Sequence, residues 1–261
     1  RNRANLGYRR RIHEQLGRMD GTPMHIADAT GELSILHSGY RGAAWEEKKV
    51  NGRNLNLILK ELEDHPGDYE MMGYLGDEYY AAGDLDKAES WYRESIASMP
   101  SVLDERDQRS AATFTYLLQI MEENGNDIDE MKLIYGKAAG LLPKEADFDY
   151  LIGTYLAADR DYAEGVLYLE RALDKLQRYG SNNRAMLIGS HLRETYENLA
   201  LCCRKTGKDE RAVSLCIAVL KSAPYSMEAL YLLLEAFRGN GFRPSVAPEK
   251  AMGILEQLYC L

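Results

Sequence analysis

The 261-residue sequence lacks any long uninterrupted run of apolar residues. Nothing in it approaches the roughly 18 apolar residues of a membrane-spanning helix, so we predict no membrane span. Positive charge is also in short supply, because 41 acidic residues outnumber 32 basic ones and give a formal net charge of -9. This balance argues against a nucleic-acid-binding surface. With 45% hydrophobic residues the chain can still bury a substantial core, and we expect it to be soluble.

Cysteine is scarce, with four residues and no spacing typical of a metal site or a redox motif. Cys202 and Cys203 are adjacent and Cys260 stands alone, so the cysteines do not form a disulfide framework. We therefore predict a reducing compartment, the cytoplasm. The common catalytic signatures are missing too, since the sequence holds no glycine-rich phosphate loop, no G-x-S-x-G turn and no H-E-x-x-H zinc helix.

The sequence does contain a pattern that returns after 124 residues. Its first copy is Leu75, Gly76, Tyr79, Gly83, Ala88, Tyr92 and Pro100, and its second is Leu199, Ala200, Cys203, Gly207, Ala212, Cys216 and Pro224. The spacing is that of two antiparallel helices, in which small residues allow a close approach, a glycine opens the turn and a proline ends the second helix. This pattern resembles the tetratricopeptide repeat, a helical hairpin of about 34 residues.

The resemblance predicts further hairpins, with units starting near positions 69, 112, 146, 193 and 227. Extra residues are then expected at Ser101–Ala111 and Arg178–His191, and an enlarged turn at Gly239–Pro248. An apolar stripe over Arg53–Asp64 predicts the closing helix of an incomplete leading unit. The expected fold class is all-α, a solenoid of about five tetratricopeptide-type hairpins. Core packing should explain most of the 18 tyrosines, with Cys203 and Cys216 as small buried fillers.

The first 52 residues do not share the helical period. Arg11–Arg18 is predicted to be helical, and the apolar runs Met24–Ala27 and Leu33–Leu36 are predicted to be two strands around a turn. Two short strands cannot form a core alone, so we interpret the segment as the remnant of a larger α/β domain plus a linker. The predicted domains are 1–52 and 53–261, and a chain that starts at Arg1 suggests a fragment. The basic residues Arg1, Arg3, Arg9, Arg10 and Arg11 form either a patch for an acidic partner or a solvated segment.

Three short motifs suggest a second family. The run Arg11–Leu16, followed by Ile35–Tyr40 and then by Arg53 and Asn54, is similar to the end of the catalytic domain in bacterial family 2 glycosyltransferases that continue into tetratricopeptide repeats. This resemblance covers residues 11 to about 100. It implies sugar transfer from a nucleotide-sugar donor, with a divalent metal ion, in a full-length enzyme. The nucleotide-binding half is absent, so we predict that this chain alone is inactive.

Inverting glycosyl transfer needs a carboxylate that deprotonates the acceptor and a cation that offsets charge on the leaving diphosphate. Glu14 is the candidate base. His13 and His37 are candidate ligands of the metal or donors to the diphosphate. The alternative for His13 and Glu14 is a hydrogen-bonded structural pair.

A tetratricopeptide array commonly binds peptides or partner helices on the concave side, which the first helix of each unit lines. The repeat phase places the following residues there: Glu70, Asp77, Tyr80, Glu194, Glu197, Leu201, Arg204, Lys205, Glu228, Tyr231, Glu235 and Arg238. This acidic strip with a basic margin predicts a groove for a basic or mixed-charge polypeptide, and ordinary solvated helix faces are the alternative. Two functions follow. The chain is either the C-terminal part of a glycosyltransferase whose repeats engage an acceptor or partner protein, or a non-enzymatic scaffold that binds a peptide.

Overall fold

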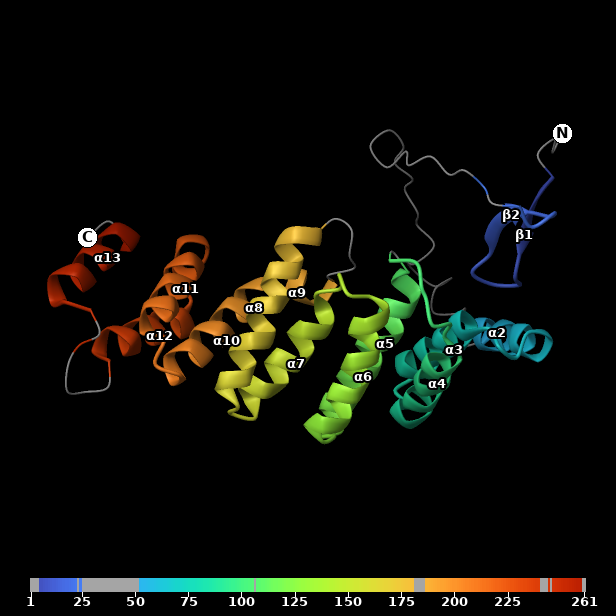
Figure 1. Cartoon of the computed structure of the whole chain (residues 1–261), viewed down its shortest axis with the longest axis horizontal. Helices are drawn as coiled ribbons and strands as arrows, with labels where there is room; N and C mark the ends of the chain where they lie inside the picture. Colours follow the sequence, from blue (N-terminus) through green and yellow to red (C-terminus); the bar gives the residue numbers. More distant parts are fainter. Residues whose placement is uncertain are drawn as a thin grey trace. The chain divides into compact units, whose positions relative to one another are not determined.

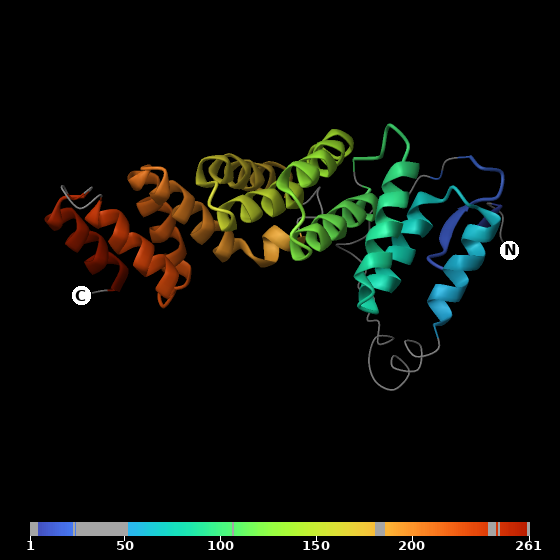
Figure 2. The same ribbon diagram turned by 90° about the horizontal axis from the view of Figure 1, so that it is seen from below.

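A computed structural model describes residues 5–22, 24, 52–105, 107–180, 186–239, 244 and 246–259 (Figure 1). The chain divides into two compact units: unit 1 comprises residues 1–99 and unit 2 comprises residues 100–261. In both, the described residues are predominantly helical, as Figure 2 shows from a second direction. No helix in the described ranges is long and apolar enough to cross a membrane.

In its described residues, unit 1 combines a two-stranded antiparallel sheet with three helices. Its elements are β1 (Leu6–Arg9), β2 (Gln15–Arg18), α2 (Arg53–Asp64), α3 (Tyr69–Ala81) and α4 (Leu85–Ser98). The strands pair in the register that places Tyr8 opposite Leu16. Helix α2 packs on α3, and α3 forms a hairpin with α4. The bounds of the leading helix, α2, are those predicted from the sequence.

The segment Arg11–Arg18 is not helical, so that prediction was wrong. Its second half is strand β2, and residues 10–14 form the loop that joins the two strands. The backbone φ angles of Arg10 and His13 are positive, 71° and 52°, which excludes helical continuity there. A helix of eight residues is only marginally stable, so tertiary contacts can override its helix propensity. The loop makes several such contacts.

Four consecutive loop residues hold the sheet on α2 and α3. Arg10 and Arg11 form ion pairs with carboxylates of this helical region, namely Asp68, Glu70, Glu61 and Asp64. Ile12 packs against the apolar cluster between α2 and α3. The ring of His13 stacks on Tyr74 with centroids 3.5 Å apart and an interplanar angle of 7°. The loop thus covers one side of the first helix pair.

Unit 2 consists, in its described residues, of helices and their connections. The helices are α5 (Gln108–Glu123), α6 (Ile128–Leu141), α7 (Asp147–Ala158), α8 (Tyr162–Tyr179), α9 (Met186–Ser190), α10 (Leu192–Lys205), α11 (Asp209–Ser222), α12 (Met227–Arg238) and α13 (Pro248–Tyr259). Hairpins form between α5 and α6, α7 and α8, and α10 and α11, while α12 packs on α10 and α11. Short α9 contacts α7 and α10.

The predicted unit starts agree with the helix starts to within one residue, except for the second. Helix α5 begins at Gln108 rather than near Ala112, because Asp107 caps it by accepting the backbone N–H of Ser110 at 2.9 Å. The extra residues expected at Arg178–His191 comprise the end of α8, the short α9 and a stretch outside the described residues.

The turns inside the hairpins each contain a residue with positive φ. An aspartate caps the next helix in the turns before α4, α6 and α8, whereas the N-cap of α11 is Lys208, which makes no side-chain cap hydrogen bond. Gly83, Gly125 and Gly207 have φ between 68° and 78°, a region that glycine enters at little cost. Asp84 and Asp161 then each accept a backbone N–H three residues further on. These bonds satisfy donors that the first turn of a helix leaves unpaired. Each turn therefore stops one helix and starts the next.

Small residues set the distance between paired helices. A Cβ added at Gly76 of α3 would lie 2.4 Å from Cε1 of Tyr92 in α4. One added at Gly153 of α7 would lie 2.8 Å from Cγ of Leu169 in α8 and 3.0 Å from the backbone nitrogen of Leu169. Neither carbon–carbon separation is possible between atoms in normal contact. The predicted role of Gly76 as a close-approach residue is confirmed.

A buried ion-pair network joins α6, α7 and α8. The Asp149 side chain is 0% exposed, and its Oδ1 accepts hydrogen bonds from Tyr135 Oη at 2.9 Å and from Arg171 Nε at 2.5 Å. Lys175 Nζ lies 2.6 Å from Asp149 Oδ2. Burial raises the pKa of Tyr135, and the Asp149 carboxylate raises it further, so the phenol stays protonated and donates.

Three cysteines lie in the core of unit 2. Cys202, Cys203 and Cys216 are free thiols with at most 1% of their surface exposed. Burial raises the pKa values of Cys202 and Cys216 to about 12, so both remain neutral thiols. The prediction that Cys203 and Cys216 act as small apolar fillers is confirmed.

The predicted domain boundary between residues 52 and 53 stays a prediction. The strands expected at Met24–Ala27 and Leu33–Leu36 lie outside the described residues, except for Met24, which is not in a strand. The division into compact units falls at Met99 and Pro100.

Replacing Gly153 by alanine should overpack the α7–α8 contact and lower the free energy of unfolding by about 1–3 kcal/mol. Gly136→Ala is the matched control, because a Cβ at this exposed position of α6 meets nothing within 4 Å. The control should stabilise the protein by roughly 0.5–1 kcal/mol. Urea unfolding followed by circular dichroism measures both. A Gly153→Ala variant as stable as the wild type would show that the helices separate without cost.

Asp149→Asn should cost on the order of 3 kcal/mol of unfolding free energy, because it leaves Lys175 and Arg171 without their buried counter-charge. The comparison is Asp174→Asn, which removes an exposed ion pair with Arg178 and should change stability by less than about 0.5 kcal/mol. The two substitutions make the same chemical change on adjacent hairpin helices. Equal effects in thermal or urea unfolding would contradict the assigned importance of the buried network.

Candidate functional site

The structure describes two of the three residues predicted for transfer chemistry. Glu14 is exposed beside the loop that precedes β2, and His13 stacks on Tyr74. His37 lies outside the described residues. Among the residues that the structure describes, no group of three or more histidine, cysteine, aspartate or glutamate side chains is placed to hold a metal ion. Catalysis by Glu14 and metal binding by the histidines stay predictions from the sequence.

The basic run near the N-terminus is largely paired within unit 1. Arg10 and Arg11 face the carboxylates of α2 and α3, and Arg9 donates to the backbone oxygen of Arg18 at 2.7 Å. Arg1 and Arg3 lie outside the described residues. Arg9, Arg10 and Arg11 therefore bind groups of their own chain.

Glu70 and Asp77, predicted as groove positions of unit 1, make polar contacts inside that unit. Glu70 pairs with Arg10 and accepts a hydrogen bond from Gln15 Nε2 at 3.2 Å. Asp77 accepts the hydroxyl proton of Tyr92 at 2.8 Å, which joins α3 to α4. The third position, Tyr80, is half-buried.

Two predicted groove residues of unit 2 hold α12 against α10. Glu197 Oε1 accepts a hydrogen bond from Oγ of Ser226, the N-cap of α12, at 2.5 Å. Arg204 donates to the carbonyl oxygens of Glu235 at 3.1 Å and Gly239 at 2.5 Å, at the other end of α12. Such donors satisfy the last carbonyls of a helix. Glu197 and Arg204 thus fasten both ends of α12.

The remaining predicted positions of unit 2 divide between packing and exposure. Leu201 is partly buried against the core, and Glu235 forms an ion pair at 3.8 Å with Arg238. The residues that remain exposed are Glu194, Lys205, Glu228, Tyr231 and Arg238. Two acidic and two basic groups make this exposed set neutral rather than acidic.

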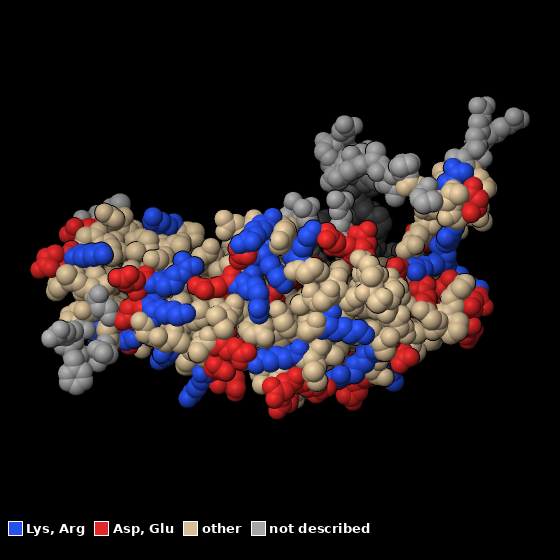
Figure 3. Space-filling view, viewed as in Figure 1, with Lys and Arg blue, Asp and Glu red and all other residues tan. Residues whose placement is uncertain are grey.

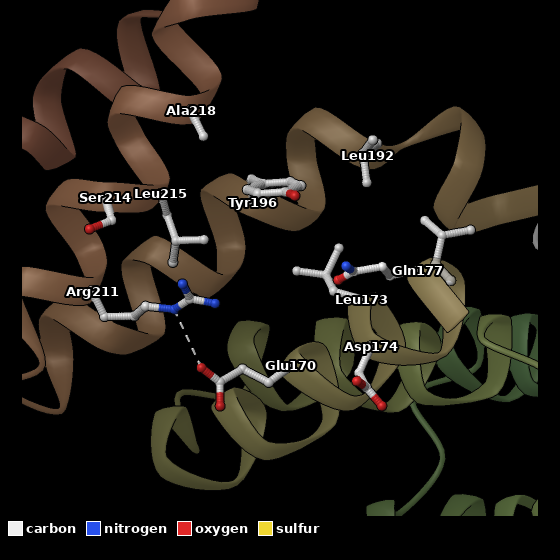
Figure 4. A pocket seen from close by; sticks show the side chains of 11 residues that line it. Glu170, Leu173, Asp174, Gln177, Leu192, Tyr196, Arg211, Ser214, Leu215 and Ala218 are labelled. Atoms are coloured by element: carbon white, nitrogen blue, oxygen red, sulfur yellow. Dashed lines mark ion pairs between the residues drawn. The ribbon is translucent and has the colours of Figure 1, made fainter. Parts of the chain in front are cut away.

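A groove of about 500 Å³ lies between α8, α10 and α11 (Figure 4). Its apolar lining consists of Leu173 and Leu176 of α8, Leu192 and Tyr196 of α10, and Leu215 and Ala218 of α11. Its polar lining consists of Glu170, Asp174, Gln177, Arg211 and Ser214. Apolar side chains with a few polar groups around them are typical of binding grooves.

A second hollow of about 400 Å³ continues the groove. It shares Leu192, Tyr196 and Ala218 with the first and adds Arg193, Val219 and Ser222. Together the two hollows follow α11 from Arg211 to Ser222. That span corresponds to about 16 Å at the helical rise of 1.5 Å per residue.

One ion pair crosses the groove. Arg211 Nε of α11 lies 3.5 Å from Glu170 Oε1 of α8, as the dashed line in Figure 4 marks. Asp174 pairs with Arg178 along its own helix at 2.8 Å. Basic and acidic side chains are interspersed over the helices of unit 2 on the face drawn in Figure 3. The charges close to the groove are therefore mostly balanced, and its apolar lining is its distinguishing property.

This groove was not predicted from the sequence. Most tyrosines were expected to pack in the core, whereas Tyr196 is part of the lining of both hollows. The available signal was the 47-residue interval between the units starting at 146 and 193. The extra residues make α8 18 residues long, whereas its partner α7 has 12. The groove residues Leu173–Gln177 lie in the C-terminal half of α8.

Comparisons with known proteins agree with the helical-hairpin architecture. Residues 55–101, which cover most of α2 and all of α3 and α4, match the tetratricopeptide repeat family. The fold is that of a tetratricopeptide-type (TPR-type) helical-hairpin array. No curated protein matches this chain. The glycosyltransferase part of the resemblance has no support in these comparisons and stays a prediction.

Two solved structures show the extent of the likeness. YrrB, described as a TPR protein with an unusual peptide-binding site, is 18% identical over 77% of this chain and 90% of its own, with a TM-score of 0.56. A putative kinesin light chain of Podosopora anserina with nearly identical TPR-like repeats is 17% identical over 75% of this chain and 95% of its own, with a TM-score of 0.45.

Glu197→Ala should lower the free energy of unfolding by about 1.5–3 kcal/mol, because it removes a charge-assisted hydrogen bond to the cap of α12. Glu194→Ala changes the same residue type one turn earlier at an exposed position, and we expect less than about 0.5 kcal/mol. Denaturant titration measures both variants. If the two variants unfold alike, Glu197 is an ordinary surface residue and the clamp on α12 does not contribute.

Proposed function

We propose that unit 2 binds a segment of a partner polypeptide in the groove between α8, α10 and α11. The observation that carries the proposal is the continuous hollow with Leu173, Tyr196 and Leu215 in its lining. Leu215 is only 3% exposed, whereas Leu173 and Tyr196 are partly buried and Leu192 is 40% exposed, so the last three leave apolar surface available for contact with a ligand. Burial of apolar area is the principal source of affinity in such sites.

The dimensions of the groove favour a helical segment. A channel about 16 Å long accommodates about three turns of α-helix, since each turn rises 5.4 Å. A helix bound in such a channel places apolar side chains at positions i, i+3 or i+4, and i+7 along one face. Its polar face would remain in water. An amphipathic helix is therefore the ligand that best fits the length and the lining.

The polar lining gives the ligand an orientation. Glu170 and Arg211 stand on opposite walls of the groove, and Arg193 lies in the second hollow. A bound helix with a basic residue near Glu170 and Asp174 and an acidic residue near Arg193 would match these charges. Exposed charges of this kind contribute more to specificity than to affinity.

One solved structure supports the proposal by analogy of fold. YrrB is described as having a peptide-binding site, and it shares the hairpin architecture at 18% identity. At that identity the likeness extends to the fold alone. The assignment of a ligand therefore rests on the groove of this chain.

The transferase hypothesis is a separate matter. Residues 10–14 form a loop that packs on α2 and α3, and this contact accounts for Arg11 and His13 without any catalytic role. Donor sugar, metal ion and acceptor remain inferences from a resemblance in sequence. The proposed function does not depend on them.

A library of random 16-residue peptides displayed on phage tests the proposal. The full chain should select sequences with apolar residues at helical spacing. Fluorescence polarisation of a labelled selected peptide should show at least a tenfold loss of affinity for Ala218→Arg, because the new side chain enters both hollows. Ala218 is exposed, so the substitution should not affect folding. A tenfold change corresponds to about 1.4 kcal/mol.

Leu133→Arg is the matched control, since it places an arginine on exposed α6 outside the groove and should leave affinity unchanged. Peptides that bind both variants equally would place the binding site elsewhere. A failure to select any peptide with helical periodicity would contradict the proposed ligand class.

A further inference from the structure

Helix α12 departs from the packing rule of the first helices before it, and α13 contacts α11. Leu234 of α12 stands at the repeat position that Gly153 and Ala200 hold in α7 and α10. A leucine there requires room that a glycine or alanine does not. Accordingly, the Leu234 side chain stays 47% exposed, and α13 has no fully buried residue.

Three large apolar side chains form an exposed stripe on α12. Met227, Tyr231 and Leu234 are 74%, 61% and 47% exposed, and their spacing of i, i+4 and i+7 places them on one face. Arg238 continues this face by one further turn. Isolated exposed apolar residues are common on proteins, but a stripe of three with a polar margin marks an interaction surface.

The neighbouring helix indicates what kind of surface this is. Helix α10 contacts α12 through Glu197, Leu201 and Arg204. One repeat length later, the same positions of α12 are Tyr231, Glu235 and Arg238. The face that α10 uses for packing is therefore repeated on α12, where no described helix covers it. A further helix that packs there would continue an interface that the chain already uses.

The stripe is complementary to itself in an antiparallel arrangement. If a second α12 lies antiparallel, with the contact centred between Tyr231 and Leu234, each tyrosine meets the leucine of the other copy. Arg238 then lies opposite Met227 and beside Glu228. The apolar pairs meet in the middle, and one pair of opposite charges closes each end. A two-fold axis makes both halves of the contact identical.

We propose that α12 is a self-association surface and that its occupant is α12 of a second copy of this chain. The contact consists of Tyr231 against Leu234, with Arg238 reaching Glu228 of the other copy. This face uses none of the residues that line the groove between α8, α10 and α11. Self-association is therefore independent of the proposed peptide binding.

Sedimentation equilibrium of the full 261-residue chain between about 1 and 200 µM tests the proposal. We expect a reversible monomer–dimer equilibrium. Leu234→Glu should weaken it at least tenfold, because it buries a charge against tyrosine. Leu133→Glu, which changes another exposed leucine on α6, should have no effect. A wild-type chain that stays monomeric throughout this range overturns the proposal.

A charge exchange tests the antiparallel geometry. Glu228→Arg and Arg238→Glu should each weaken the dimer several-fold, because each places like charges at both ends of the contact. The double variant restores opposite charges and should recover most of the lost affinity. Both residues are exposed, so each variant should fold, and circular dichroism of each variant checks this. Additive losses in the double variant, or a dimer that Leu234→Glu does not weaken, would show that α12 does not pair in this way.

Discussion

The close approach of paired helices at one small residue is the contact on which the rest of the structure depends. At Gly76 and Gly153 the neighbouring side chain occupies the space that a Cβ would take. This leaves little freedom for a helix to rotate against its partner, because close-packed interiors do not deform gradually. Once the rotation is fixed, each first helix has one face toward its partner, one toward the next hairpin and one toward solvent. Core, inter-hairpin contacts and exposed surface all follow from that division.

Charged residues in unit 2 are used to a large extent for contacts within the chain. The buried carboxylate of Asp149 pairs with the partly exposed Arg171 and with Lys175, while Glu197 and Arg204 fasten α12. Groups committed in this way are poor sites for a ligand, since a ligand would have to replace bonds that already exist. A ligand is then expected to bind at surfaces whose apolar side chains the chain itself does not cover. The groove and the α12 stripe are two such surfaces, and each combines apolar area with a small number of charges.

The periodic part of the fold was predictable from the sequence, and the aperiodic part was not. Helix α2 and the starts of α3 and α12 follow from apolar spacing and from caps such as Asp68 and Ser226. The loop at Arg10 was not predicted, because contacts with carboxylates distant in sequence determine its conformation. The groove was not predicted either, because it depends on the added length of α8, which the repeat pattern treats as an insertion. Glu197 and Arg204, which the repeat phase placed in a ligand groove, bond to the next first helix, α12, and their role toward a ligand stays a prediction.

The residue types on α12 indicate that a partner covers its outer face when the protein functions. At the position of Glu197 the chain has Tyr231, and at that of Ala200 it has Leu234. Permanent contact with water favours the opposite change, from apolar to charged, because exposed apolar surface carries a cost and promotes non-specific association. The charged members of the face, Glu228 and Arg238, lie near its two ends, where they limit the contact to one register. A surface with an apolar centre and opposite charges at its ends distinguishes a specific partner from general hydrophobic adhesion, since a shifted register would leave the charges unpaired against apolar groups.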